Sequence, residues 1–155
     1  MKESELLKEI EDLDNKIKID ELFARRLVLK DYNTIVDWWK SWPDWEPLEI
    51  DLLPENGTGG IMIEKNNKPI VAGFLYTTNS NICWMEWIIS NPNYNEKDKS
   101  EAIELLILEL EQWAINGGFK VILSIGRSKG LLKKHKKLGY YVDDKPSYEI
   151  IKKIK

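Results

Sequence analysis

Apolar residues near the start of the chain follow a helical repeat. Leu6, Ile10, Leu13 and Ile17 are spaced four, three and four residues apart, which predicts an amphipathic helix with an a/d seam over residues 1–21. Two heptads are too short for a stable isolated coiled coil. We therefore expect the seam to pack either on the rest of the chain or on a second copy in a homodimer.

Strand-like and helix-like patterns alternate through residues 22–155, which we expect to form one domain. A nearly continuous apolar run at 82–90, a helical stripe at 99–116 and a further strand predict a βαβ crossover with parallel strands. Hairpin signals on either side predict antiparallel neighbours. The pattern therefore predicts an α+β fold with a mixed, mostly antiparallel sheet, a central parallel pair and flanking helices. Expected strands are 23–29, 60–64, 69–77, 82–90, 119–125, 140–143 and 148–154, and expected helices are 31–41, 99–116 and 128–138.

Composition narrows the function classes. The chain has 155 residues and a formal net charge of −3, which argues against a general nucleic-acid binder, although ten basic against three acidic side chains in residues 127–155 keep a tRNA contact as a minor option. A single cysteine and a single histidine exclude a disulfide framework and multi-histidine metal sites, so we expect no metal. No apolar run could span a bilayer and the first residues are not signal-like, so we expect a cytoplasmic chain without a membrane partner.

Two segments carry candidate chemistry. The predicted helix 99–116 begins in a charged stretch, and a helix N-terminus offers free N–H groups and a positive dipole end to a phosphate. Asp98 and Glu101 also have capping-box spacing, which alone would describe an ordinary capped helix. Glu86 is the one charged residue in the apolar run 82–90. Strand alternation places Glu86 on one face with Ile82, Trp84 and Ile88.

Burial gives Glu86 two possible roles. Burial raises the pKa of a carboxyl group, which suits a base that takes a proton from an amine. The alternative is a structural ion pair with a nearby Lys or Arg.

These segments and the order of elements resemble the GCN5-related N-acetyltransferase family over residues 22–154. The family's signature is a strand, a Gln/Arg-x-x-Gly-x-Gly/Ala loop and a helix. In this sequence Lys97 takes the Gln/Arg position, Ser100 the first glycine position and Ala102 the Gly/Ala position. The resemblance implies that the central parallel strands splay apart and that acetyl-coenzyme A is the cosubstrate. The implied pyrophosphate contacts are Lys97, Lys99, Ser100, Glu101 and Ala102, and the implied pantetheine contacts are the backbones of Ile88, Ile89 and Ser90.

The family's second element is Asn-x-x-Ala-x-x-Leu-Tyr-x-x-x-Gly-Phe, whose tyrosine protonates the leaving thiolate. Leu138-Gly139-Tyr140 matches its ending, and His135 holds the tyrosine position. The resemblance thus implies Glu86 as the base and His135 as the acid, although His135 could equally be a surface residue of a basic helix. Lys129 and Lys133 could meet the coenzyme phosphates or form a solvated face.

Seven tryptophans are present, four of them within residues 38–45. Trp39 and Trp42 share a helical stripe with Ile35 and are expected in the core, whereas Trp38 points elsewhere. An aromatic ring among carboxylates can hold a cationic amine. Candidate substrate contacts are therefore Trp38, Trp45 and Glu46, with a loop simply pinned by Trp45 as the alternative.

The resemblance implies direct transfer of an acetyl group to a primary amine of a small molecule or protein. Cys83 lies in an apolar strand and has no neighbouring sequence cue for activation. Ser100 and His135 depart from the family pattern and a helix is added, which favours a catalytically weak or inactive binding or regulatory protein as the alternative. The Lys-, Asn- and Ile-rich composition and the Trp-rich segment are similar to small acetyltransferase-like proteins of bacteriophages, which could act on a host partner.

Overall fold

A five-stranded sheet carries the fold in the computed structural model, which describes residues 2–154 without the side chains of residues 14–20. The strands lie in the order β1-β2-β3-β4-β5. Neighbours are antiparallel from β1 to β4, and β4 and β5 are parallel. The predicted α+β class is therefore confirmed. The strands are β1 (Phe23–Arg26), β2 (Gly60–Lys65), β3 (Lys68–Tyr76), β4 (Ile82–Ser90) and β5 (Val121–Ser124).

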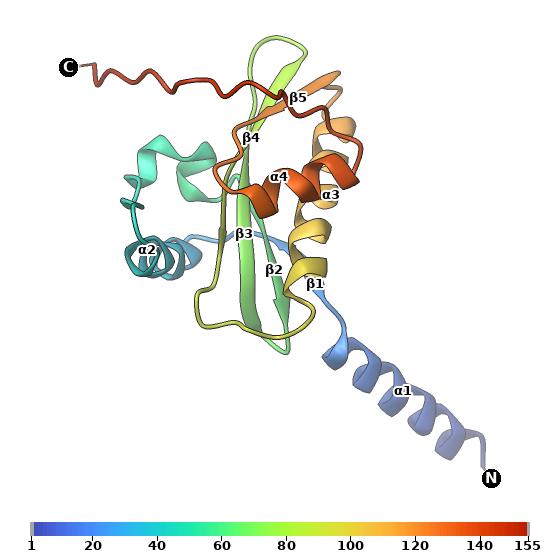
Figure 1. Ribbon diagram of the computed structural model, residues 1–155. Coiled ribbons are helices and arrows are strands. Elements are labelled where there is room, and N and C mark those ends of the chain that lie inside the picture. Colours follow the sequence, from blue (N-terminus) through green and yellow to red (C-terminus); the bar gives the residue numbers. More distant parts are fainter. Residues whose placement is uncertain (1, 155) are drawn as a thin grey trace. The chain divides into compact units, whose positions relative to one another are not determined.

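Helices cover both faces of the sheet. Figure 1 shows α2 (Asp31–Ser41) on one side and α3 (Lys99–Asn116) on the other. The stripe of α3 formed by Ala102, Leu106 and Leu110 is fully buried, and this helix packs on β2 and β3. Helix α1 (Glu3–Asp20) precedes β1, and two 3₁₀ turns, η1 (Ile50–Leu52) and η2 (Pro54–Gly57), lie in the segment between α2 and β2.

The core on the α2 face joins helix and sheet. Ile35, Trp38 and Trp39 of α2 lie in one buried cluster with Ala72, Phe74 and Ile89 of the sheet and Leu53 from the segment after α2. The expectation that Trp38 points away from the core is wrong. The cluster therefore includes residues of α2, of the sheet and of the segment that follows α2.

Strand β4 contains one extra residue. Ala72 pairs with Ile89 and Phe74 pairs with Glu86, so Trp87 and Ile88 together oppose the single residue between Ala72 and Phe74. Such a β-bulge inserts an unpaired residue and bends the strand. Trp87 has a φ of 58°, in the left-handed region that large side chains rarely adopt.

The bulge resets the alternation of side chains along β4. Glu86 lies opposite Phe74 on the α2 face, and Trp87 also packs against the α2-face cluster. Ile88 is instead directed towards α3, since its side chain lies beside Gly73 together with side chains of that helix. The predicted sharing of one face by Glu86 and Ile88 is therefore wrong, because strict alternation cannot hold across an inserted residue.

Gly73 of β3 faces this bulge and has no room for a side chain. A Cβ atom there would lie 3.1 Å from Leu110 and 3.2 Å from both Ile88 and Leu106. Glycine thus lets α3 approach the sheet beside the bulge.

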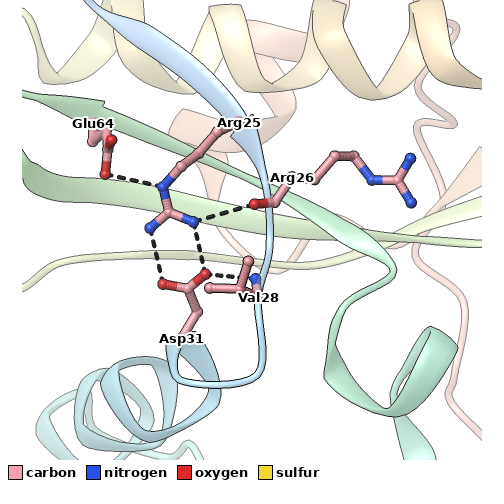
Figure 2. A network of polar contacts seen from close by, with 5 residues as sticks. All are labelled: Arg25, Arg26, Val28, Asp31 and Glu64. Atoms are coloured by element: carbon pink, nitrogen blue, oxygen red, sulfur yellow. Dashed lines mark hydrogen bonds and ion pairs between the residues drawn. The ribbon is translucent and has the colours of Figure 1, made fainter.

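A polar network fixes the start of α2 to the sheet (Figure 2). The Arg25 guanidinium donates to both carboxylate oxygens of Asp31, at 2.8 and 2.9 Å, and to Glu64 at 3.1 Å. The Val28 N–H donates to the same Asp31 carboxylate at 2.8 Å. Burial raises the pKa of Asp31, but the hydrogen bonds from Arg25 and Val28 outweigh it and hold the pKa below its ordinary value.

The residues from Gly126 onward form a second compact unit. It contains α4 (Lys129–Lys137), whose N-cap Ser128 accepts a hydrogen bond from the Leu131 N–H. The predicted closing strands at 140–143 and 148–154 are wrong, because these segments pair with no strand among the described residues. Tyr148 and Ile150 are 95% and 96% exposed, so no apolar burial holds an extended pair there.

The lowered pKa of Asp31 predicts a stability contribution that depends on pH. The contribution is present above the unfolded carboxyl pKa of about 3.9 and is lost as the pH falls through the lower folded value. Asp31→Asn should therefore lower the free energy of unfolding at pH 7 by about 2 kcal/mol and by clearly less near pH 3, measured by urea unfolding. The control Asp37→Asn, at an exposed position of α2, should change little at either pH; an equal loss for Asp31→Asn at both pH values would contradict the assignment.

The tight space around Gly73 predicts that a single methyl group is destabilising. Gly73→Ala should lower the free energy of unfolding by about 1–3 kcal/mol, because the overpacked side chains of α3 must shift. Gly130→Ala is the matched control, since a Cβ there would meet nothing within 4 Å, and it should be neutral or slightly stabilising. Urea unfolding of both variants tests this, and equal stabilities would contradict the close packing.

Candidate functional site

Glu86 lies where the parallel strands part. The last residues paired between β4 and β5 are Met85 and Ser124, and the Ser124 hydroxyl donates to the Met85 carbonyl at 2.7 Å. The next amide, Ile125 N–H, donates to Oε1 of the buried Glu86 carboxylate at 2.9 Å. The side chain of Glu86 thus takes a donor that would otherwise continue the ladder, and pairing ends there.

Tyr76 and Trp87 form a hydrogen-bonded chain beside this carboxylate. Trp87 Nε1 donates to the Tyr76 hydroxyl at 2.9 Å, and that hydroxyl donates to the Leu52 carbonyl at 2.9 Å. Burial raises the pKa of Tyr76, the hydrogen bond from Trp87 lowers it in part, and the negative charge of Glu86 raises it further. The phenol is therefore neutral at physiological pH and lies within the electrostatic reach of Glu86.

Two further tryptophans complete an aromatic group on the α2 face. Trp45 packs edge-on against Trp87, with ring centroids 6.3 Å apart. Trp42 Nε1 donates to the Ser90 carbonyl at 2.8 Å. Trp42 was expected only as core packing, and sequence reasoning missed this bond; the general need of a half-buried indole N–H for a partner was the one available signal.

Beyond the bulge, part of the β4 backbone turns away from β3. The Asn91 N–H donates to the Ile70 carbonyl at 2.7 Å, so by antiparallel alternation the N–H and C=O of Ser90 and Ile88 point to the opposite side. On that side β5 has already ended, opposite Met85. The backbone of Ile89 instead pairs with Ala72 of β3, and the side chain of Ile89 is buried.

The N-terminus of α3 has no side-chain cap. The predicted Asp98–Glu101 capping box is wrong, because Lys65 Nζ and the Tyr94 hydroxyl donate to the Asp98 carboxylate at 2.9 and 2.7 Å. The hydrogen bonds from Tyr94 and Lys65 hold the pKa of Asp98 below its ordinary value, so it stays charged. The first amides of α3 are therefore left without a carboxylate partner at the helix end.

The residues predicted to hold a pyrophosphate differ in exposure. Lys97, Ser100 and Glu101 are exposed, and Ala102 is fully buried in the packing of α3. Lys99 Nζ lies 5.5 Å from the centroid of the Trp42 ring. Since Trp42 also bonds to Ser90, one indole joins the start of α3 to the part of β4 that turns away from β3.

His135 and the predicted phosphate-binding lysines lie in the second unit. His135 is buried and not a surface residue, and its ring packs edge-on against Tyr140 at 5.1 Å. Nδ1 lies 2.9 Å from the Leu131 carbonyl, which can only accept, so Nδ1 carries the hydrogen. The other ring nitrogen, Nε2, has no hydrogen-bond partner in the described part of the chain. Lys129 and Lys133 are exposed.

The remaining candidates separate by burial. Cys83 is fully buried and burial raises the pKa of its thiol, so no reactive thiolate is offered. Trp38 is buried in the core, Trp45 is half-buried and Glu46 is exposed.

The side chains that the structure describes contain no group of three or more His, Cys, Asp or Glu residues that could hold a metal ion. Among the described residues, no helix combines the length and apolar character needed to cross a bilayer.

Comparison with known proteins gives the fold a context. No family model and no curated protein matches the sequence. Among solved structures, a GCN5-related N-acetyltransferase from Ralstonia eutropha matches with a TM-score of 0.60 at 14% identity, over 84% of this chain and 99% of that one.

Two similar structures contain coenzyme A. N-acetylglutamate synthase from Neisseria gonorrhoeae, with coenzyme A and L-arginine, matches with a TM-score of 0.64 at 11% identity, over 83% of this chain and 30% of that one. Diaminobutyrate acetyltransferase from Paenibacillus lautus, with its substrate and coenzyme A, gives 0.56 at 12% identity, over 78% and 75%. The chain therefore has the fold of the GCN5-related N-acetyltransferases.

Proposed function

We propose that this protein transfers an acetyl group from acetyl-coenzyme A to a primary amine. The observation that supports this most is the β4 bulge, which comes directly after the buried Glu86 and is followed by Ser90, whose backbone groups point away from β3. The coenzyme A in two structures of the same fold supports the same ligand.

The coenzyme would bind along β4 and at the start of α3. Pantetheine is an extended chain with two amides, and it would pair with the backbone of Ile88 and with the Ser90 N–H as a strand would, since the Ser90 carbonyl already accepts a hydrogen bond from Trp42 Nε1. Its pyrophosphate would lie on the uncapped amides of Ser100 and Glu101, where the helix dipole favours negative charge. Lys97 and Lys99 would add positive charge, and Lys65 already neutralises the adjacent Asp98.

The reaction would be a direct transfer. Glu86 would accept a proton from the substrate ammonium, directly or through a water, and the freed amine nitrogen would attack the thioester carbonyl. The C–N bond forms, the C–S bond breaks, and the departing thiolate of coenzyme A takes up a proton. The buried Cys83 thiol argues against a covalent acetyl-enzyme step.

The proton for the thiolate has a candidate source in His135. A neutral His135 offers only a lone pair at Nε2, because Nδ1 donates to Leu131, so His135 could act as an acid only as the imidazolium. We retain it as a prediction, together with phosphate contacts from Lys129 and Lys133.

The acceptor would approach the aromatic group on the α2 face. Trp45 lies in the loop after α2 and packs on Trp87 of β4, and the neighbouring loop residue Glu46 is exposed. A ring beside carboxylates favours a cationic substrate, in keeping with a primary amine.

A coenzyme-binding protein without efficient turnover is the second candidate. Ser100 stands where a glycine would let the backbone approach a phosphate most closely, and the segments at 140–143 and 148–154 form no strands. Such a protein, for example one made by a phage, would use the same surface to hold a ligand or a host partner.

Binding of acetyl-coenzyme A is the first prediction. Calorimetric titration should give saturable heat, and the ligand at 100 times its Kd should raise the free energy of unfolding by about 2.7 kcal/mol. Ser100→Pro removes one amide donor at the start of α3 and should weaken binding. Ser100→Ala, which keeps the amide, is the control. If acetyl-coenzyme A at millimolar concentration produced no heat and no thermal stabilisation, both acetyl transfer and coenzyme binding would be excluded.

Loss of the base is the second prediction. Glu86→Gln should lower amine-dependent release of free coenzyme A, assayed with a thiol reagent over a panel of primary amines, by about 100-fold or more, because the amide cannot take the proton. Coenzyme affinity should stay within about twofold, and the exposed control Glu5→Gln should behave as wild type. Unchanged turnover in Glu86→Gln would remove Glu86 as the base, and binding without turnover in the wild type would favour the second candidate.

A further inference from the structure

Helix α1 presents an apolar stripe to solvent. Leu6, Ile10 and Leu13, which lie on its a/d seam, are 49%, 55% and 60% exposed. Leu7 beside them is also 60% exposed, and the side chain of Ile17 lies outside the described residues. The seam was expected to pack either on the rest of the chain or on a second copy, and the rest of the chain leaves its three described residues uncovered. An isolated helix of 18 residues is only marginally stable unless its apolar face is buried.

The heptad register identifies the positions beside the stripe. Leu6 and Leu13 fall at d and Ile10 and Ile17 at a, so the seam spans four layers between Glu3 and Asp20, the charged residues at the next a and d positions. The flanking g and e positions, which set partner and orientation in coiled coils, hold Glu9 and Lys16 at g and Leu7 and Asp14 at e.

Charge distinguishes the two ways in which this helix can pair with a copy of itself. In a parallel pair, g of one helix meets the following e of the other, which brings Glu9 against Asp14 twice and, at the C-cap of the helix, Lys16 against Glu21 twice. In an antiparallel pair, g meets g, which brings Glu9 against Lys16 twice, and Leu6 and Ile10 stack on Ile17 and Leu13 of the second copy. The antiparallel direction therefore has attractive g–g contacts and no like-charge contact at these positions, whereas the parallel direction places Glu9 against Asp14.

The connection to the sheet fits the same direction. Only Glu21 and Leu22 separate the end of α1 from the start of β1. Paired helices lie about 8–10 Å apart, so a parallel pair would bring both domains to the same end with a two-residue connection. An antiparallel pair puts the domains at opposite ends of a helix about 27 Å long.

We infer that α1 pairs with α1 of a second copy as a two-stranded antiparallel coiled coil, which joins two chains into a homodimer. Four apolar layers form its seam, and two Glu9–Lys16 contacts set its direction. The dimer is independent of acetyl transfer, so its test is independent of the proposed function.

Sedimentation velocity of the full chain over a wide concentration range tests this pairing. Wild type should dimerise reversibly. Glu9→Lys and Lys16→Glu should each weaken the dimer about tenfold at low salt, because two attractive contacts become repulsive, and the double variant should restore it. Glu11→Lys and Lys18→Glu make the same charge changes at b positions, off the seam, and should leave the dimer unchanged. Leu13→Glu should give a monomer, with unchanged near-ultraviolet circular dichroism showing that the domain remains folded.

Three outcomes would overturn the inference. The first is a wild-type chain that stays monomeric at several hundred micromolar. The second is a dimer that Glu9→Lys strengthens, because this would indicate a parallel pair. The third is a dimer that Leu13→Glu does not weaken, because its interface would then lie elsewhere on the chain.

Discussion

One inserted residue in β4 organises the rest of the candidate site. Trp87 and Ile88 together lie opposite Gly73, and this interrupts the alternation of side chains between the two faces of the sheet. Glu86 and Trp87 therefore both lie on the α2 face, and Ile88 is directed towards α3. A left-handed backbone at a tryptophan is unfavourable by about 1–3 kcal/mol. This backbone conformation is stabilised by the surrounding packing and by the hydrogen bond between Trp87 and Tyr76. Gly73, which has no Cβ atom, leaves space for the neighbouring side chains.

The parallel ladder ends directly before the bulge. Past Met85 the carboxylate of Glu86 takes the Ile125 amide, so β4 continues without β5 beside it. Trp42 then links the Ser90 carbonyl to the start of α3 through its indole N–H and its ring under Lys99. The features that suit a coenzyme are therefore connected through hydrogen bonds and packing within one unit of the chain.

The sequence predicted the parallel pair of β4 and β5, their antiparallel neighbours and the helices because the periodicities of these elements are long and regular, as in the α3 stripe of Ala102, Leu106 and Leu110. It also located Glu86 as a lone charge in an apolar run. It missed the bulge, because alternation carries no mark of an inserted residue, although a glycine inside β3 was a signal of close approach. The two strands expected after α4 are absent, because an alternating apolar pattern does not show whether a neighbouring strand is available for pairing.

Local charge spacing was equally misleading at the start of α3. Asp98 has capping-box spacing with Glu101, but two tertiary partners, Lys65 and Tyr94, take its carboxylate. Trp38 likewise lies in one buried cluster with Leu53, which is distant in sequence. Both errors concern contacts between segments that no local pattern encodes.

The most direct test of the account is residue-specific amide NMR during titration with coenzyme A. If β4 beyond the bulge and the start of α3 hold the coenzyme, the amides of Ile88, Ser90, Ser100 and Glu101 should show the largest shifts and gain protection from hydrogen exchange. Amides on β1 and on the exposed side of α1 should not move. Saturable binding that leaves those four amides unchanged would contradict the account.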